Sequence, residues 1–267
     1  MLYDAKNGEL QLGDRILYYV TFGKGSRPLV MIPGLGDGLR TVKGLAASFA
    51  WMYRRYAKEY RVYVFSRPEP VLEGETTADM AEEAAEAMKA LGLESAYVLG
   101  VSQGGMIAQH LAARHPELVK KLILAVTCPK SNDSVINACD RWIDMAERGD
   151  YAALTVDSAE TNYTPAYLAR MRRMYPIATR MGKPKDFTRF IRESRACRTH
   201  DASAVLGEIR CPTLVIGAEE DQIIGPQASR ELAAAIPDAG LCLFPGYGHG
   251  VYEETEDFHR RVRDFFR

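Results

Sequence analysis

The feature that most constrains the fold of this chain is a regular alternation of short apolar runs with longer helical stretches. The apolar runs are Pro28–Ile32, Arg61–Phe65, Ala96–Leu99, Lys121–Val126, Thr213–Ile216 and Leu241–Phe244. Runs of this length, bounded by Gly, Pro or Ser, are typical of strands that are buried on both faces. Because helical stretches lie between them, the pattern predicts parallel βαβ units and therefore an α/β fold.

Two further predictions complete this α/β part. The residues before the alternation predict a hairpin, in which Glu9–Leu12 and Arg15–Phe22 are joined by the turn dipeptide Gly13-Asp14. Helices between and after the strands are expected at Leu39–Lys58, Thr77–Leu91, Met106–Arg114, Pro226–Ile236 and Thr255–Phe266.

The alternation stops in one long segment. Between Cys128 and about Gly207 no strand is predicted, and the segment is expected to form short helices at Val135–Glu147, Pro165–Tyr175 and Lys185–Cys197. We therefore expect residues 1–127 and 208–267 to form an α/β core, and residues 128–207 to form a helical insertion.

Composition excludes several classes of protein. The 267 residues carry 34 Lys and Arg against 35 Asp and Glu, a net charge of -1, which argues against a nucleic-acid partner. No apolar run approaches the roughly 20 residues of a membrane span, and the N-terminus lacks a secretory signal pattern. The five cysteines form no CxxC pair and no histidine pattern suggests a metal site. We expect a cytoplasmic protein without membrane partner, metal or cofactor.

One motif carries chemistry. Gly100-Val101-Ser102-Gln103-Gly104 fits the pattern G-x-S-x-G between a predicted strand and a predicted helix. The glycines permit a tight turn without clashes of Cβ atoms, and the turn holds the serine hydroxyl outward at the start of the helix. Ser102 is therefore the candidate nucleophile.

A serine nucleophile needs a base and an acid that orients the base. Of the five histidines, His249 stands out because it lies in a Gly-rich loop directly after a strand. Asp221 follows the preceding strand in the same way, although Glu219 and Glu220 are neighbours that compete for the acid role. The order Ser102, Asp221, His249 is the one expected for this catalytic arrangement.

With these motifs the chain resembles serine-nucleophile members of the α/β-hydrolase superfamily that carry a helical cap domain. The motifs are Pro33-Gly34-Leu35-Gly36, Gly100–Gly105, Gly217–Asp221 and Gly246–His249. The resemblance implies a mostly parallel eight-stranded sheet flanked by helices, with the insertion as a cap over the triad. It also implies an oxyanion hole made by the backbone N–H groups of Leu35 and Gln103.

The chain departs from the common family pattern at two places. Pro33-Gly34 stands where the family often has His-Gly, and Ser66-Arg67-Pro68 stands where it often has Asp-x-Arg-Gly, so a structural role is expected for Arg67. Ser102 also excludes the haloalkane dehalogenases and epoxide hydrolases of this fold, which use an aspartate at that position.

The insertion is strongly basic. Residues 170–198 contain ten Lys and Arg against two acidic residues, so the rest of the chain is acidic. Arg189 and Arg192 lie near one helix face, where they either form a solvated surface or face the cleft and attract a carboxylate or phosphate of the substrate. Gly34, Met106 and Trp142 are further candidates for substrate contacts.

These residues favour a serine hydrolase that cleaves a small carboxylic ester or lactone, with an anionic substrate as one possibility. Hydrolysis of a carbon–carbon bond and acyl transfer to another acceptor use the same triad and stay open. A third alternative is a small-molecule receptor on a hydrolase scaffold. The sequence does not specify the natural substrate, the acyl chain length, the acceptor or the oligomeric state.

Overall fold

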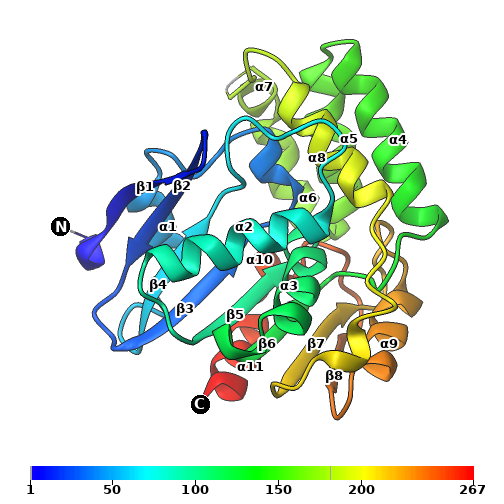
Figure 1. The fold of residues 1–267 in the computed structure, drawn as a ribbon. Coiled ribbons are helices and arrows are strands. Elements are labelled where there is room, and N and C mark those ends of the chain that lie inside the picture. Colours follow the sequence, from blue (N-terminus) through cyan, green and yellow to red (C-terminus); the bar gives the residue numbers. More distant parts are fainter. Residues whose placement is uncertain (1, 181) are drawn as a thin grey trace.

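The computed structural model describes residues 2–180 and 182–267, which build one eight-stranded sheet (Figure 1). Its strands are β1 (Lys6–Leu12), β2 (Arg15–Phe22), β3 (Arg27–Ile32), β4 (Tyr60–Phe65), β5 (Ala96–Val101), β6 (Val119–Ala125), β7 (Thr213–Ala218) and β8 (Gly240–Phe244). The strand order is β1-β2-β4-β3-β5-β6-β7-β8. The pairs β1·β2 and β2·β4 are antiparallel and the other pairs are parallel, which confirms the predicted hairpin and mostly parallel sheet.

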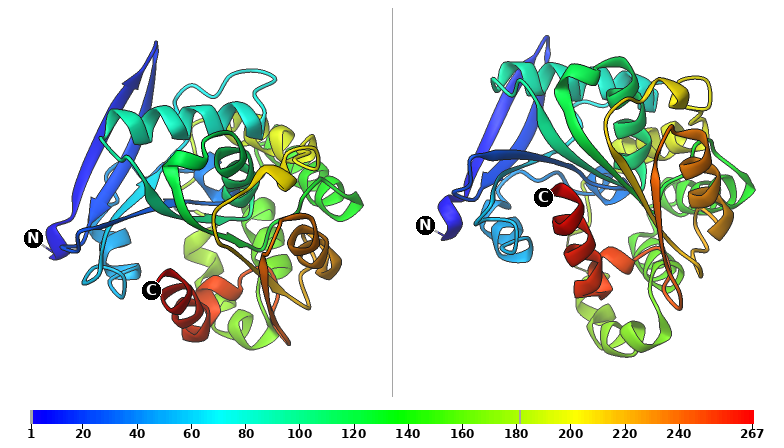
Figure 2. Two further views of the ribbon diagram at one scale, coloured as in Figure 1. Left: turned by 60° about the horizontal axis from the view of Figure 1, so that its bottom comes forward. Right: turned by 90° about the horizontal axis from the view of Figure 1, so that it is seen from below.

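Helices cover both faces of this sheet (Figure 2). They are α1 (Ala46–Met52), α2 (Thr77–Ala90), α3 (Gln103–Arg114), α9 (Pro226–Ala235), α10 (Val251–Glu254) and α11 (Glu256–Phe266). Successive residues of β3 alternate between the faces, as the twofold period of a strand requires. Val30 and Ile32 pack with α2 and α3, whereas Leu29 and Met31 pack with α1 and α11. No helix in the described part of the chain is long and apolar enough to cross a membrane.

In the described residues between β6 and β7 there are five further helices. They are α4 (Asp133–Glu147), α5 (Tyr151–Asn162), α6 (Pro165–Met171), α7 (Tyr175–Ala178) and α8 (Thr188–Arg198), and Figure 1 shows them gathered at one end of the sheet. Trp142 and Phe190 of this segment share an apolar cluster with Met106 and Ile224 of the α/β part. The division into a core and a separate cap domain stays a prediction.

Two helix predictions were wrong in detail, and one helix was missed. The stretch Leu39–Lys58 holds only the short α1, because Gly44 turns the chain at a φ of 78° just before it. Helix α5 was not predicted at all. The stretch predicted as one helix from Pro165 to Tyr175 divides into α6, a 3₁₀ turn and α7.

A buried cluster of charges joins α8 to the α/β part. It comprises Asp37 from the 3₁₀ turn η2 (Leu35–Gly38), Arg67 from the loop after β4, and Arg189 and Glu193 from α8. Arg189 forms an ion pair with Asp37, and its Nη2 lies 3.1 Å from Oε1 of Glu193. Asp37, Arg67 and Glu193 are almost fully buried. Burial raises the pKa of Glu193 to about 7, against the opposing effect of Arg189 and Arg67.

The same cluster holds the segments that follow β3 and β5. The guanidinium of Arg67 donates to the carbonyl oxygen of Pro33 at 2.5 Å and to Oε1 of Gln103 at 2.7 Å. The side chain of Gln103 in turn donates to the backbone carbonyl of Glu193 at 2.9 Å. Arg67 therefore has the structural role that was expected, and α8 is tied to the start of α3.

Helix α3 can approach β3 closely because Gly104 has no side chain. A Cβ atom at Gly104 would lie 1.9 Å from the backbone oxygen of Ile32, which cannot move without shifting β3. We therefore expect Gly104→Ala to lower the free energy of unfolding in urea by about 3 kcal/mol or more. The control is Gly207→Ala, where no atom lies within 4 Å of the added Cβ. Equal stability of the two variants would contradict this account of the packing.

Arg189 offers a test of the charge cluster. Arg189→Met keeps much of the apolar stem but leaves Asp37 and Glu193 without their closest cation, so we expect a loss of about 3 kcal/mol of unfolding free energy. The matched control is Arg195→Met on the same helix, because Arg195 is half exposed and its ion pairs in the described part of the chain are with Glu73 and Glu147. Its loss should stay below about 1 kcal/mol. A smaller effect at Arg189 than at Arg195 would contradict a structural role of the cluster.

Candidate active site

Ser102 lies at the sharp turn between β5 and α3. Its backbone adopts φ 54° and ψ −119°, a conformation that is strained for a residue with a side chain. The turn is fixed because the N–H group of Ser102 donates to the carbonyl of Ala125 in β6 at 2.9 Å. Gly34 lies close by, since a Cβ atom there would be 3.2 Å from Cβ of Ser102. The geometry is the strained turn that the G-x-S-x-G pattern predicts.

The imidazole of His249 meets the carboxylate of Asp221. Nδ1 of His249 lies 2.8 Å from Oδ2 of Asp221, and both residues are buried. The other oxygen of Asp221 accepts hydrogen bonds from the N–H groups of Ile223 at 2.9 Å and Ile224 at 3.1 Å. With Nδ1 engaged by the carboxylate, Nε2 is the ring nitrogen left for chemistry.

The two neighbours of Asp221 are placed elsewhere. Glu219 is exposed and forms an ion pair with Arg230, and Glu220 is exposed as well. His200, which could also have faced the site, is buried and hydrogen-bonded to Thr77, and burial lowers its pKa to about 3. Among the described residues, therefore, Asp221 alone is hydrogen-bonded to the side chain of His249.

Helix α5 packs directly on the loop that carries His249. The N–H group of Gly250 donates to the carbonyl of Asn162 at 2.8 Å. A Cβ atom at Gly248 would lie 2.8 Å from that same oxygen, and one at Gly250 would lie 2.4 Å from the ring of Tyr163. The glycines on both sides of His249 thus allow the end of α5 to approach the imidazole loop.

Two backbone N–H groups begin helical turns beside Ser102. Leu35 is the first residue of η2 and Gln103 is the first residue of α3. The first N–H groups of a helix have no partner within that helix, and they carry partial positive charge. They are therefore available to an oxyanion that forms on a carbonyl carbon bound to Ser102.

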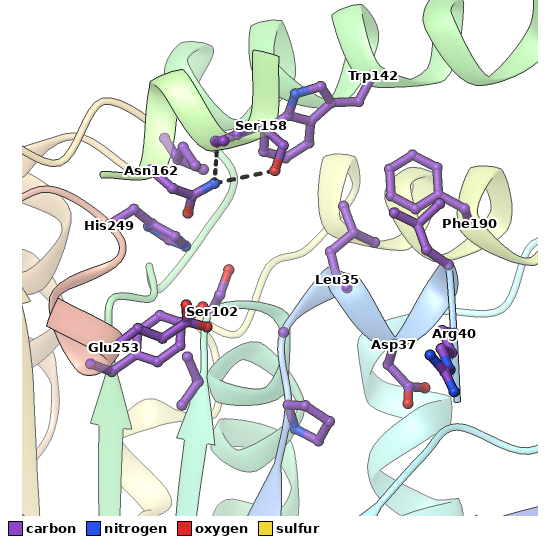
Figure 3. A pocket seen from close by; sticks show the side chains of 18 of the residues that line it. Leu35, Asp37, Arg40, Ser102, Trp142, Ser158, Asn162, Phe190, His249 and Glu253 are labelled. Atoms are coloured by element: carbon purple, nitrogen blue, oxygen red, sulfur yellow. Dashed lines mark hydrogen bonds between the residues drawn. The ribbon is translucent and has the colours of Figure 1, made fainter. Parts of the chain in front are cut away.

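Ser102 and His249 open into a cavity of about 510 Å³, a size that suits a small-molecule ligand. Figure 3 shows the two side chains directed toward the same part of this cavity, with Leu35 and Phe190 on the opposite side. Gly34, Met106 and Trp142 line it, as the sequence suggested. Trp142 is fixed there because its Nε1–H group donates to Asp157 at 2.8 Å.

The expectation that Arg189 or Arg192 faces the cleft is wrong. Neither residue lines the cavity, and each is engaged elsewhere. Arg189 belongs to the buried charge cluster, and Arg192 pairs with Glu73 and donates to the carbonyl of Val71 at 2.6 Å. Helix periodicity placed both arginines near one face, but that face packs against acidic and carbonyl groups of the α/β part.

Sequence reasoning missed one wall of the cavity. Its polar residues are Thr155, Ser158, Asn162, Tyr163 and Glu253. The first three lie on α5, whose start could have been recognised from Gly149-Asp150, because the side chain of Asp150 caps the helix through the N–H group of Ala153. No sequence signal distinguished Glu253 from its neighbour Glu254.

The described residues contain no group of three or more His, Cys, Asp or Glu side chains that could hold a metal ion. The cavity that Ser102 lines instead receives the imidazole of His249, with the carboxylate of Asp221 behind it, and Leu35. Gln103 follows Ser102 at the start of α3. This arrangement can activate a hydroxyl group and stabilise a negatively charged oxygen.

The comparisons with known proteins agree with this geometry. A family model described as the alpha/beta hydrolase fold matches residues 27–152 and 164–256. The "Putative carbamate hydrolase RutD" of Agrobacterium fabrum is 30% identical over 193 residues, which are 70% of this chain and 72% of that protein. The "2-hydroxy-6-oxononadienedioate/2-hydroxy-6-oxononatrienedioate hydrolase 2" of Pseudomonas putida is 26% identical over 98% of this chain and 94% of its own length.

A solved structure extends the likeness to the whole fold. MGS-M2, an alpha/beta hydrolase enzyme from a Medee basin deep-sea metagenome library, superposes with a TM-score of 0.86 at 23% identity and covers 97% of both chains. Together with the family model, which matches most of the sequence, this likeness shows that the chain belongs to the alpha/beta hydrolase family.

Proposed function

We propose that this hydrolase cleaves a carboxylic ester or lactone through an acyl-enzyme on Ser102. The observation that carries the proposal is the 2.8 Å hydrogen bond between His249 and Asp221, in a cavity that Ser102 also lines. A carboxylate on Nδ1 fixes the tautomer in which Nε2 can accept a proton, and it stabilises the imidazolium that forms.

The reaction then follows from these positions. Nε2 of His249 takes the proton of the Ser102 hydroxyl while the serine oxygen attacks the substrate carbonyl carbon. The N–H groups of Leu35 and Gln103 stabilise the resulting oxyanion. His249 returns the proton to the leaving alkoxide, and a water molecule activated by the same imidazole releases the acyl group.

In this proposal residues 128–207 act as a cap. Trp142 from α4 and Phe190 from α8 line the cavity above Ser102, so a bound ester is enclosed between them and the edge of the sheet. The apolar contacts favour an apolar group near Leu35 and Phe190. The absence of Arg189 and Arg192 from the lining removes the reason for an anionic substrate.

A second candidate is hydrolysis of a carbon–carbon bond, which the likeness to the Pseudomonas putida hydrolase supports over nearly the whole chain. The likeness to the Agrobacterium fabrum protein similarly adds carbamates to the carbonyl substrates worth testing. Trapping an acyl-enzyme with an ester supports acyl chemistry. Partition of that intermediate to an added alcohol distinguishes an acyltransferase from a hydrolase.

A receptor on a hydrolase scaffold is the alternative outside enzyme chemistry. A fluorophosphonate probe distinguishes the two, because an activated serine reacts with it covalently. Labelling at Ser102 together with repeated ester turnover supports the enzyme.

Ser102→Ala tests the proposed nucleophile. We expect the variant to lose at least about a thousandfold in kcat with p-nitrophenyl butyrate while its circular dichroism spectrum stays unchanged, because the other groups cannot replace the nucleophile. Ser203→Ala is the control, since Ser203 is exposed and does not line the cavity. Retained turnover in Ser102→Ala would remove the proposed mechanism.

A further inference from the structure

The cavity beside Ser102 has two unlike walls. Ser158, Asn162 and Glu253 lie on the side of His249, whereas Leu35 and Phe190 lie on the other side (Figure 3). The apolar wall suits a hydrocarbon group of any substrate. The polar wall contains the carboxylate of Glu253, which has no role in the mechanism proposed above.

The protein provides a hydrogen bond to one of the two carboxylate oxygens of Glu253. One of its carboxylate oxygens, Oε2, accepts a hydrogen bond from the hydroxyl of Tyr163. Within residues 2–180 and 182–267, Oε1 of Glu253 has no hydrogen-bond donor from the protein, and no Lys or Arg side chain forms an ion pair with Glu253. The side chain is nevertheless accessible from the cavity that it lines. Desolvation by the surrounding protein raises the pKa of Glu253, and the charge of Glu254 adds to this, whereas the hydrogen bond from Tyr163 lowers it.

The neighbouring residue Glu254 has a purely structural role and can be compared with Glu253. Glu254 accepts hydrogen bonds from the N–H group of Thr164 at 3.0 Å and from the hydroxyl of Thr164, and so it ties α10 to the start of α6. Both of its oxygens are used by the protein. The bond between Tyr163, which directly follows α5, and Glu253 also links that segment with α10, but it uses one carboxylate oxygen only.

The place of Glu253 relates it to one part of the substrate. Glu253 follows His249 by four residues and lies in the short helix α10, which begins two residues after His249. In the proposed mechanism His249 protonates the leaving alkoxide, so the alcohol portion of the substrate lies on the His249 side of the cavity. Glu253 and Tyr163 therefore border the alcohol portion and not the oxyanion.

The charges of the residues that line the cavity determine which alcohol portion of a substrate binds favourably there. Among the described residues that line the cavity, Arg40 is the one Lys or Arg, and Figure 3 shows it beside Asp37, on the side away from His249. A carboxylate of the substrate near Glu253 would face like charge, whereas an ammonium group would supply the missing cation and a hydrogen-bond donor.

We propose that Glu253, oriented by Tyr163, is a specificity-determining residue that binds a protonated amine on the alcohol portion of the substrate. The substrate class is esters of amino alcohols. This inference rests on the proposed ester hydrolysis for the assignment of the alcohol side, but the binding of an ammonium group at Glu253 does not depend on turnover.

Two esters of the same shape test the proposal. They are 2-(dimethylammonio)ethyl acetate, which is protonated at neutral pH, and 3-methylbutyl acetate, in which a CH group replaces the N–H group. Because the ammonium alcohol is also the better leaving group, the informative quantity is the ratio of the two kcat/KM values, compared between variants. We expect Glu253→Gln to lower this ratio by about tenfold or more.

The matched control is Glu256→Gln. It removes the same charge three residues further on, where Glu256 is exposed, pairs with Arg55 and does not line the cavity. This variant should keep the wild-type ratio, which separates a local contact from a general effect of charge. Equal ratios in wild type and Glu253→Gln would overturn the proposal, and so would a wild-type preference for the neutral ester.

A binding experiment separates this inference from the proposed function. If the wild-type protein hydrolyses neither ester nor p-nitrophenyl butyrate, ester hydrolysis fails, and calorimetry with 2-(dimethylamino)ethanol and 3-methylbutan-1-ol then decides on the subsite. We expect the protonated amino alcohol to bind about tenfold tighter than its neutral analogue, and Glu253→Gln to abolish the difference. Equal binding of the two alcohols to the wild-type protein would refute the subsite whether or not the protein is an esterase.

Discussion

The buried charge cluster of Asp37, Arg67, Arg189 and Glu193 is the constraint on which the site depends. Charges of this kind are costly to bury, and they persist only where partners compensate them. Here the compensation connects three segments that are distant in the sequence, because Arg67 also donates to the carbonyl of Pro33 and to the side chain of Gln103. The positions of the candidate oxyanion N–H groups of Leu35 and Gln103 thus depend on how α8 packs against the α/β part.

The helical segment contacts the other half of the site as well. The end of α5 packs on the glycines beside His249, through the carbonyl of Asn162 and the ring of Tyr163. A movement of the segment would therefore disturb the imidazole and the oxyanion N–H groups together. The helical segment is thus attached to the α/β part at two places. The apolar residues of the two parts also pack in one common cluster.

Most of the α/β part could be predicted from the sequence because its signals are local. Short apolar runs specify strands, and the turn around Ser102 needs glycines at fixed offsets whatever surrounds it. The acid was harder, since three adjacent carboxylates compete, and only the fold shows that Asp221 reaches His249. The partners of Arg189 and Arg192 could not be predicted, because periodicity gives the face of a helix but not the groups that this face meets. Helix α5 was missed although a cap signal marks its start, and with it the polar wall of the cavity was missed.

The ion pairs of the basic segment, residues 170–198, change the interpretation of its charge. A basic segment in a chain of net charge -1 suggests a cationic site, yet in the described part of the chain five of its ten Lys and Arg side chains form ion pairs with carboxylates. Examples are Arg172 with Glu160, Arg192 with Glu73, and Arg198 with Asp140. None of these ten side chains lines the cavity, so the positive charge of the segment does not face a ligand bound there. What reaches the cavity beside His249 is a carboxylate, Glu253, with one hydrogen bond to a tyrosine. Because a ligand responds to the charges that line its own cavity at close range, a single unpaired carboxylate there outweighs many screened arginines on the outer surface.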